Sequence, residues 1–125
     1  MRDAAVAIAF AAMATPASAM PVSEFLSRFE ALEANGDSSK LAAQLGELRS
    51  EVQKDAAELR AERLEAAAAG RAPAYCPPPE APAPTAQEIV KALEEVPEEN
   101  RPFIEVKDAL RGYLAFRFPC QSARP

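Results

Sequence analysis

The chain has 125 residues, enough for one domain, and a net charge of −5 at pH 7. Its hydrophobic content of 49 % overstates the core, because 29 of its residues are alanine. The chain has no histidine and only two cysteines, which excludes Ser-His-Asp and Cys-His nucleophile pairs, histidine-ligated zinc and Cys₄ metal sites. Lys and Arg are scattered along this acidic chain, which argues against nucleic acid as the main partner.

The first 19 residues have the features of a signal peptide. An uncharged apolar run over residues 4–14 is followed by Ala-Ser-Ala at residues 17–19, the small-x-small pattern that signal peptidase reads. As a helix the run would be about 16 Å long, roughly half the hydrocarbon thickness, so we expect no stable membrane span. We predict cleavage between Ala19 and Met20, which leaves one domain over residues 20–125. Two alternatives are an N-terminal helix that packs on the domain and translation that starts at Met20.

The mature chain begins with a predicted amphipathic helix over residues 23–35, with Ser23 as its N-cap. A second helical region follows over residues 38–69 and ends at Gly70. If it were unbroken, this region would be about 48 Å long, several times the radius of gyration of a small domain. We therefore expect either a break at Gly46 or an overhang that packs against a second copy.

Both helices carry an apolar stripe at helical spacing. The stripe of the first helix consists of Phe25, Leu26, Phe29 and Leu32. The stripe of the second consists of Leu41, Leu45, Leu48, Val52 and Leu59, with Ala56 expected to fill its gap.

Residues 72–84 hold six of the twelve prolines, which predicts a stiff, polyproline-like spacer; we call this segment the strap. The sequence Thr-Ala-Gln-Glu at residues 85–88 is a capping box ahead of a short helix that Pro97 ends. The chain is thus predicted to be all-α, a small bundle of four or five helices with a Pro-rich strap and one disulfide.

The last helix is predicted to follow Arg101, which should be extended because a proline comes next, and to hold Pro102 in its first turn. Gly112 lies in the middle of this helix, where we expect a close approach by another helix. The inward face of the helix is predicted to consist of Phe103, Val106, Leu110, Tyr113 and Leu114.

Cys76 lies in the strap and Cys120 follows the last helix. In an exported chain, two cysteines predict one intramolecular disulfide. The 44-residue loop it would close corresponds to about 4 kcal/mol in the chain-entropy model. The alternative is a pair of reduced, buried cysteines in a cytosolic protein.

The acidic residues Glu94, Glu95, Glu98 and Glu99 surround Pro97. We interpret them as a solvated face; two alternatives are electrostatic complementarity to a basic partner and acid–base catalysis by paired carboxylates. The sequence predicts no catalytic residue, cofactor or metal site, and it assigns no partner-binding residue.

The C-terminal half resembles the Rap/Tai type of immunity protein, small periplasmic all-α proteins that protect bacteria from type VI secretion amidase effectors. The resemblance rests on Cys-Pro-Pro-Pro at residues 76–79, the capped helix, Val-Pro-Glu at residues 96–98, and Phe-Pro-Cys at residues 118–120. It implies a disulfide between Cys76 and Cys120, a periplasmic location and dimerisation. The N-terminal half lacks the second cysteine pair common in that family and looks closer to uncharacterised exported alphaproteobacterial proteins, so no effector-binding residue is carried over.

We therefore expect a non-enzymatic exported protein that binds another protein. The more specific form of this hypothesis is an inhibitor of a cell-wall-degrading effector. The alternative is a structural or envelope-accessory helical protein that self-associates, as a homodimer for example, and has no toxin partner. A third class, an enzyme, would need carboxylates alone to carry out its chemistry.

Overall fold

The computed structural model describes residues 19–34 and 38–121, with the side chains of residues 38 and 39 left aside, and over these residues the chain is all-α. The elements in chain order are α1 (Val22–Ala34), α2 (Ser38–Ala68), α3 (Ala86–Glu94), the 3₁₀ turn η1 (Glu98–Asn100) and α4 (Val106–Arg117). Within the described residues, extended pairing is limited to one isolated bridge between Pro21 and Glu105. The predicted fold class is confirmed, whereas all but the last residue of the predicted signal peptide lies outside the described residues.

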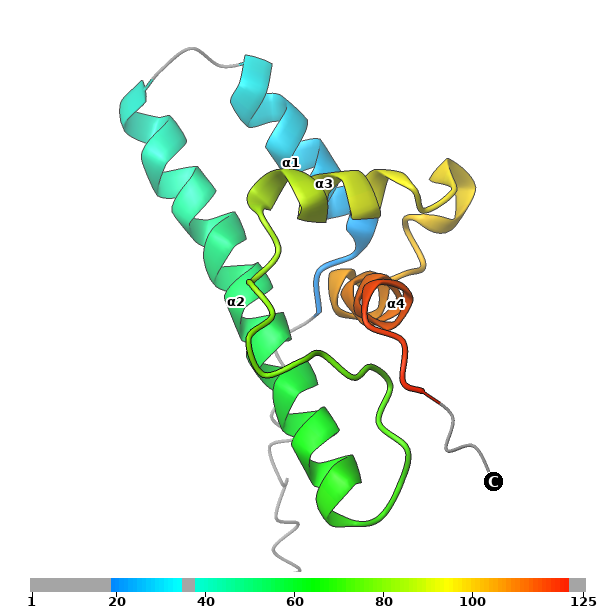
Figure 1. Ribbon diagram of the computed structural model, residues 1–125. Coiled ribbons are helices and arrows are strands. Elements are labelled where there is room, and N and C mark those ends of the chain that lie inside the picture. Colours follow the sequence, from blue (N-terminus) through cyan, green and yellow to red (C-terminus); the bar gives the residue numbers. More distant parts are fainter. Residues whose placement is uncertain (1–18, 35–37, 122–125) are drawn as a thin grey trace, which may run out of the picture.

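The long helix α2 forms one side of the molecule and the other helices pack against it or against each other (Figure 1). α1 runs beside the N-terminal half of α2, α4 packs against α2 and α3, and the strap returns from the far end of α2 to α3. The core lies where these helices meet. Its buried side chains are Val22, Phe25, Leu26, Leu32, Leu48, Leu59, Tyr75, Leu93, Val106 and Leu110.

α1 begins one residue earlier than predicted, and Ser23 is not its N-cap. The main-chain N–H of Val22 donates to the carbonyl of Ile104 at 2.8 Å, and that of Ser23 donates to the carbonyl of Arg101 at 3.1 Å. Carbonyls from the segment before α4 thus satisfy the first free N–H groups of α1, a role that a capping side chain usually has.

α2 is continuous through Gly46, so of the two expectations for this region the break is wrong. One side of the far end packs against the strap, where Tyr75 is 6 % exposed and Ala66 of the helix is 8 % exposed. The residues around Ala66 are exposed, and packing of this end against a second copy stays a prediction. The prediction that Ala56 fills the gap in the apolar stripe is also wrong. Ala56 faces solvent, and the buried position between Val52 and Leu59 belongs to Asp55, which is 4 % exposed.

The capping box of α3 forms as predicted. The N–H of Glu88 donates to the Thr85 hydroxyl oxygen at 3.2 Å, and the N–H of Thr85 donates to the Glu88 carboxylate at 3.1 Å. This carboxylate accepts the Thr85 N–H and, second, interacts with Arg117, so its pKa lies below the usual value.

The segment before α4 differs from the prediction. Arg101 is helical (φ −57°, ψ −35°) rather than extended. Its Nε donates to the Val96 carbonyl at 2.9 Å and its Nη2 to the Glu94 carbonyl at 2.8 Å. These bonds to the end of α3 outweigh the local preference of a residue before proline. α4 consequently begins at Val106, and Phe103, predicted to face the core, is 86 % exposed.

Gly112 does not mark a close approach between helices. A Cβ built at this position meets no atom within 4 Å, so the glycine faces open space on the outer side of α4. Of the other residues predicted to face inward, Val106 and Leu110 are buried in the core and Leu114 is partly buried against it. Tyr113 does not belong to the core, and its hydroxyl accepts a hydrogen bond from Arg117 at 3.1 Å.

Candidate functional site

The end of α2 creates the first part of a pocket. Gly70 has φ +71°, the left-handed conformation that favours glycine after the last helical turn. The N–H of Gly70 donates to the Ala67 carbonyl at 3.2 Å, and the N–H of Arg71 donates to the Ala66 carbonyl at 2.8 Å. These two bonds form a Schellman motif, which ends the helix and fixes the position of Arg71.

The strap supplies the second part of the pocket. Tyr75 turns back onto the last turns of α2, and its ring is buried. The next residue, Cys76, forms a disulfide with Cys120, with a Cα–Cα distance of 4.8 Å. The N–H of Cys76 also donates to the Phe118 carbonyl at 2.8 Å. The predicted disulfide is confirmed, and it ties the segment that carries Tyr75 to the end of α4.

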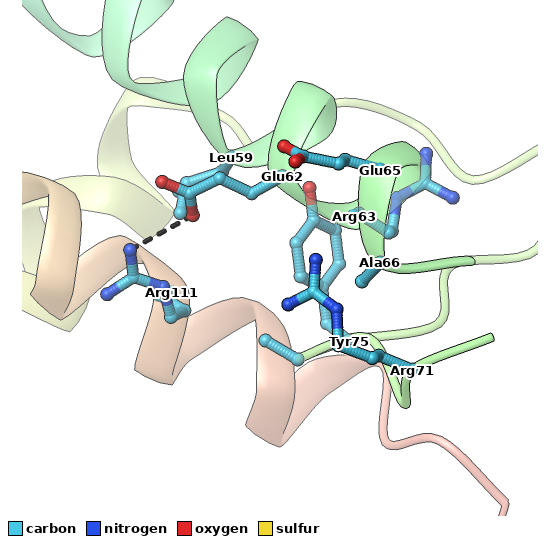
Figure 2. A pocket seen from close by; sticks show the side chains of 9 residues that line it. Leu59, Glu62, Arg63, Glu65, Ala66, Arg71, Tyr75 and Arg111 are labelled. Carbon is cyan, nitrogen blue, oxygen red and sulfur yellow. Dashed lines mark hydrogen bonds and ion pairs between the residues drawn. The ribbon is translucent and has the colours of Figure 1, made fainter. Parts of the chain in front are cut away.

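Between the end of α2, the start of the strap and α4 lies a pocket of about 280 Å³ (Figure 2). We call it the arginine pocket. Figure 2 shows Arg111 on one side, with its guanidinium directed toward Glu62. The lining residues are Leu59, Glu62, Arg63, Glu65, Ala66, Arg71, Ala74, Tyr75 and Arg111.

An ion-pair network joins α2 to α4 at the edge of the pocket. Lys107 Nζ lies 2.7 Å from a Glu62 oxygen and 3.1 Å from a Glu58 oxygen, and Arg111 Nη2 lies 3.1 Å from the other Glu62 oxygen. The hydrogen bond from Lys107, followed by that from Arg111, lowers the pKa of Glu62. The bond to Glu62 in turn raises the pKa of Lys107 and of Arg111. These groups therefore keep their charges at neutral pH.

The other two arginines of the pocket, Arg63 and Arg71, form no ion pair with any described residue. The guanidinium carbon of Arg63 lies 5.5 Å from the centre of the Tyr75 ring, a cation–π arrangement. The Nε of Arg63 is buried and has no hydrogen-bond partner among the described residues. The pocket thus holds positive charge that the described part of the chain leaves uncompensated.

One buried carboxyl group lies outside the pocket, on the face of α2 that packs in the bundle. Burial, followed by repulsion from Glu51 and Glu58, raises the pKa of Asp55 to about 6, while Lys54 and Lys107 act in the opposite direction. Asp55 is therefore partly protonated in mildly acidic solution.

Two phenylalanines lie on the surface. Phe116 of α4 and Phe103 before it are each 86 % exposed. On α4, Phe116 comes one helical turn after Gly112, and both residues face solvent. Exposed aromatic rings of this kind are a feature of interaction surfaces.

The predicted site residues have different outcomes. Cys76 and Cys120 are bonded as predicted, and the acidic residues around Pro97 are exposed, as a solvated face requires. The proposed cleavage point between Ala19 and Met20 stays a prediction. Met20 nevertheless belongs to the packed structure, because its carbonyl accepts the N–H of Val106 at 2.9 Å.

No residue of the arginine pocket was predicted as a binding residue, and Leu59 was predicted only as part of the apolar stripe of α2. The only local signal was Gly70 at the end of a helical region, directly before Arg71. In the part of the chain that the structure covers, acidic and cysteine side chains do not gather into a cluster that could hold a metal ion. Over the same residues, no helix has the length and apolar character needed to cross a membrane.

Comparisons with known proteins find no matching family, no matching curated protein and no matching solved structure. The resemblance to the Rap/Tai immunity proteins therefore stays a prediction.

Proposed function

We propose that this protein is an exported, non-enzymatic domain that acts by binding another protein. The observation that carries the proposal is the exposure of Phe103 and Phe116, each 86 % accessible to solvent. Aromatic side chains are enriched at protein–protein interfaces, and burial of one phenylalanine against a partner contributes about 1.5–3 kcal/mol. Two such rings in a small chain favour a binding role.

The scaffold around these rings suits recognition. The disulfide fixes the C-terminal end of α4 against the strap, and Lys107 and Arg111 hold α4 against α2. The pKa values of Glu62 and Arg111 are shifted away from neutrality. Such groups hold a constant charge, which serves electrostatic complementarity better than it serves proton transfer near neutral pH.

The sharper form of the proposal is an immunity-type inhibitor of a secreted, cell-wall-degrading amidase in the periplasm. Its support is the signal-peptide pattern over residues 1–19, the disulfide, which is typical of an oxidising compartment, and the resemblance of the C-terminal half to immunity proteins.

The test uses the oxidised protein purified without residues 1–19. It is titrated into purified peptidoglycan amidases, beginning with any encoded by a neighbouring gene, while release of muropeptides is measured. We expect inhibition that saturates at a fixed stoichiometry and weakens in a Phe116→Ser variant. Glu47→Gln, an exposed change on α2, is the matched control. The proposal fails if no such gene lies nearby, the enzymes stay active and no complex forms.

A structural, self-associating protein is the second candidate, and the exposure of Leu64 favours it. This leucine lies on α2 and is 51 % exposed. Sedimentation at several concentrations distinguishes the two candidates, because a strict monomer would remove the self-association hypothesis and a Leu64→Gln variant should weaken any dimer.

A further inference from the structure

The arginine pocket has the charge, size and lining of a site for one negatively charged group. We propose that it binds a single carboxylate group, presented by an acidic side chain or a C-terminus of the protein partner. The inference rests on the proposed function for the source of this carboxylate, whereas the binding site itself is a property of the chain alone.

The charges of the lining favour a monoanion. Three arginines and two glutamates line the pocket. Arg111 is paired with Glu62 and with Asp108, and the remaining lining charges, those of Arg63, Arg71 and Glu65, leave a net charge of +1. Glu62 is already engaged by Lys107 and Arg111, whereas Arg63 and Arg71 form no ion pair with a described residue. One carboxylate would balance this charge. A phosphate dianion would bring a second negative charge close to Glu62 and Glu65.

The geometry favours a carboxylate over a neutral group. A guanidinium presents a planar fork of N–H donors that matches the two oxygens of a carboxylate. Arg71 is exposed at the mouth and forms no ion pair with a described residue, so its donors are free for such a group. Arg111 lies across the pocket, where Glu62 and Asp108 already bind its two terminal nitrogens (Figure 2). Arg63 adds positive charge beside the Tyr75 ring.

The size limits what enters. A pocket of about 280 Å³ lies at the lower end of the volumes of ligand sites, about 300–1,000 Å³. It accommodates the end of one side chain or of one polypeptide. The buried ring of Tyr75 and the methyl group of Ala66 offer apolar contact to the carbon atoms that carry the carboxylate.

The site is tested first on the oxidised protein alone. Acetyl-glutamate amide, acetyl-glutamine amide and inorganic phosphate are titrated separately while the arginine Nε–H signals are followed by NMR. We expect the glutamate probe to shift the signals of Arg71 and Arg63 saturably, with a Kd on the order of 1 mM. The glutamine probe should cause no shift, and phosphate should bind more weakly.

Arg71→Gln is the test variant, because Arg71 is exposed and its side chain holds no other part of the fold. We expect this variant to bind the glutamate probe at least about tenfold more weakly, with an unchanged melting temperature. Arg60→Gln, an exposed change elsewhere on α2, should leave binding unchanged. Absence of saturable shifts, equal binding of the glutamine probe, or tighter binding of phosphate would each overturn the proposal.

A second arm identifies the source of the carboxylate. If the partner supplies it, Arg71→Gln should weaken the complex with the inhibited amidase by a similar factor. A complex that forms undiminished with Arg71→Gln would overturn the assignment to the partner and leave a free small carboxylate as the ligand. Because the first arm uses no partner, failure of the proposed function and failure of the site give different results.

Discussion

The main-chain N–H of Cys76 donates to the carbonyl of Phe118 at 2.8 Å, two residues before the cysteine to which Cys76 is bonded. A hydrogen bond and a covalent bond therefore join the strap to the end of α4 at the same place. Because Tyr75 directly precedes Cys76 and is buried against the end of α2, this connection holds together the core and one wall of the arginine pocket.

Reduction of the disulfide should therefore destabilise the protein strongly. The closed loop of 44 residues corresponds to about 4 kcal/mol in the chain-entropy model. At about 4–8 °C per kcal/mol for a domain of this size, the melting temperature should fall by well over 10 °C. Thermal unfolding followed by circular dichroism, with and without reductant, measures the change.

The matched control is the double variant Cys76→Ser, Cys120→Ser. It should melt at the temperature of the reduced protein and should not respond to reductant. A wild-type melting curve that is the same with and without reductant would show that the bond contributes nothing to stability.

The second prediction concerns Asp55, whose pKa is raised by burial to about 6 from a value near 4 in the unfolded chain. Between these values the native state binds more protons than the unfolded state, so the free energy of unfolding should fall as pH rises from about 4 to about 6. Above that range the ionised carboxylate costs roughly 1–3 kcal/mol. Asp55→Asn should recover this amount at pH 7.

Urea denaturation at pH 4, 5, 6 and 7 tests this dependence through the difference between Asp55→Asn and the wild type. The difference should grow from near zero at pH 4 and level off above about pH 6. Glu47→Gln, which changes an exposed carboxylate on the same helix, should give a small difference at every pH. A constant difference for Asp55→Asn would contradict the raised pKa.

Much of the fold could be predicted because its signals are local. Helical spacing identified Phe25, Leu26 and Leu32 as the buried face of α1, and the pattern Thr-x-x-Glu located the start of α3. The disulfide followed from the count of two cysteines in a chain with a signal-peptide pattern. The helix predictions depended only on residues close together in sequence. The disulfide prediction depended on the fact that two cysteines can form only one intramolecular pair.

The errors arose where contacts distant in sequence decide the structure. Arg101 is helical because its side chain binds carbonyls at the end of α3, and this displaces Phe103 from the core. Asp55 is buried because its position on α2 faces the bundle. Residue type alone favoured the neighbouring Ala56 for this buried position, because alanine is apolar. The arginine pocket joins α2, the strap and α4, so no local pattern could indicate that Arg71 and Arg111 line one pocket.

The third prediction concerns Glu62, which accepts hydrogen bonds from Lys107 and Arg111 across the interface of α2 and α4. Its native pKa is lowered, so its contribution is present above the unfolded pKa of about 4.3 and is lost as pH falls through the native value. Because the groups are partly exposed, Glu62→Gln should cost about 0.5–1 kcal/mol at pH 7. Urea denaturation at pH 7 and pH 3 measures both values.

The loss caused by Glu62→Gln should shrink at pH 3 and in 1 M salt, since screening weakens partly exposed ion pairs. Glu95→Gln, which changes an exposed carboxylate at the end of α3, should have little effect under any of these conditions. An equal loss at pH 3 and pH 7 would show that Glu62 acts through packing rather than through its charge.

The last prediction compares two glycines. Gly112 lies within α4, and a Cβ there would meet no atom within 4 Å, so Gly112→Ala should stabilise the protein by about 0.5–1 kcal/mol through the lower backbone entropy of the unfolded chain. Gly70 also has open space around it, but its φ of +71° disfavours any side chain, so Gly70→Ala should destabilise by about 1 kcal/mol. Thermal unfolding measures both. If Gly112→Ala raises the melting temperature and Gly70→Ala lowers it, the effect of helix propensity is distinguished from that of a left-handed backbone conformation. Stabilisation by both substitutions would contradict the left-handed turn that fixes Arg71.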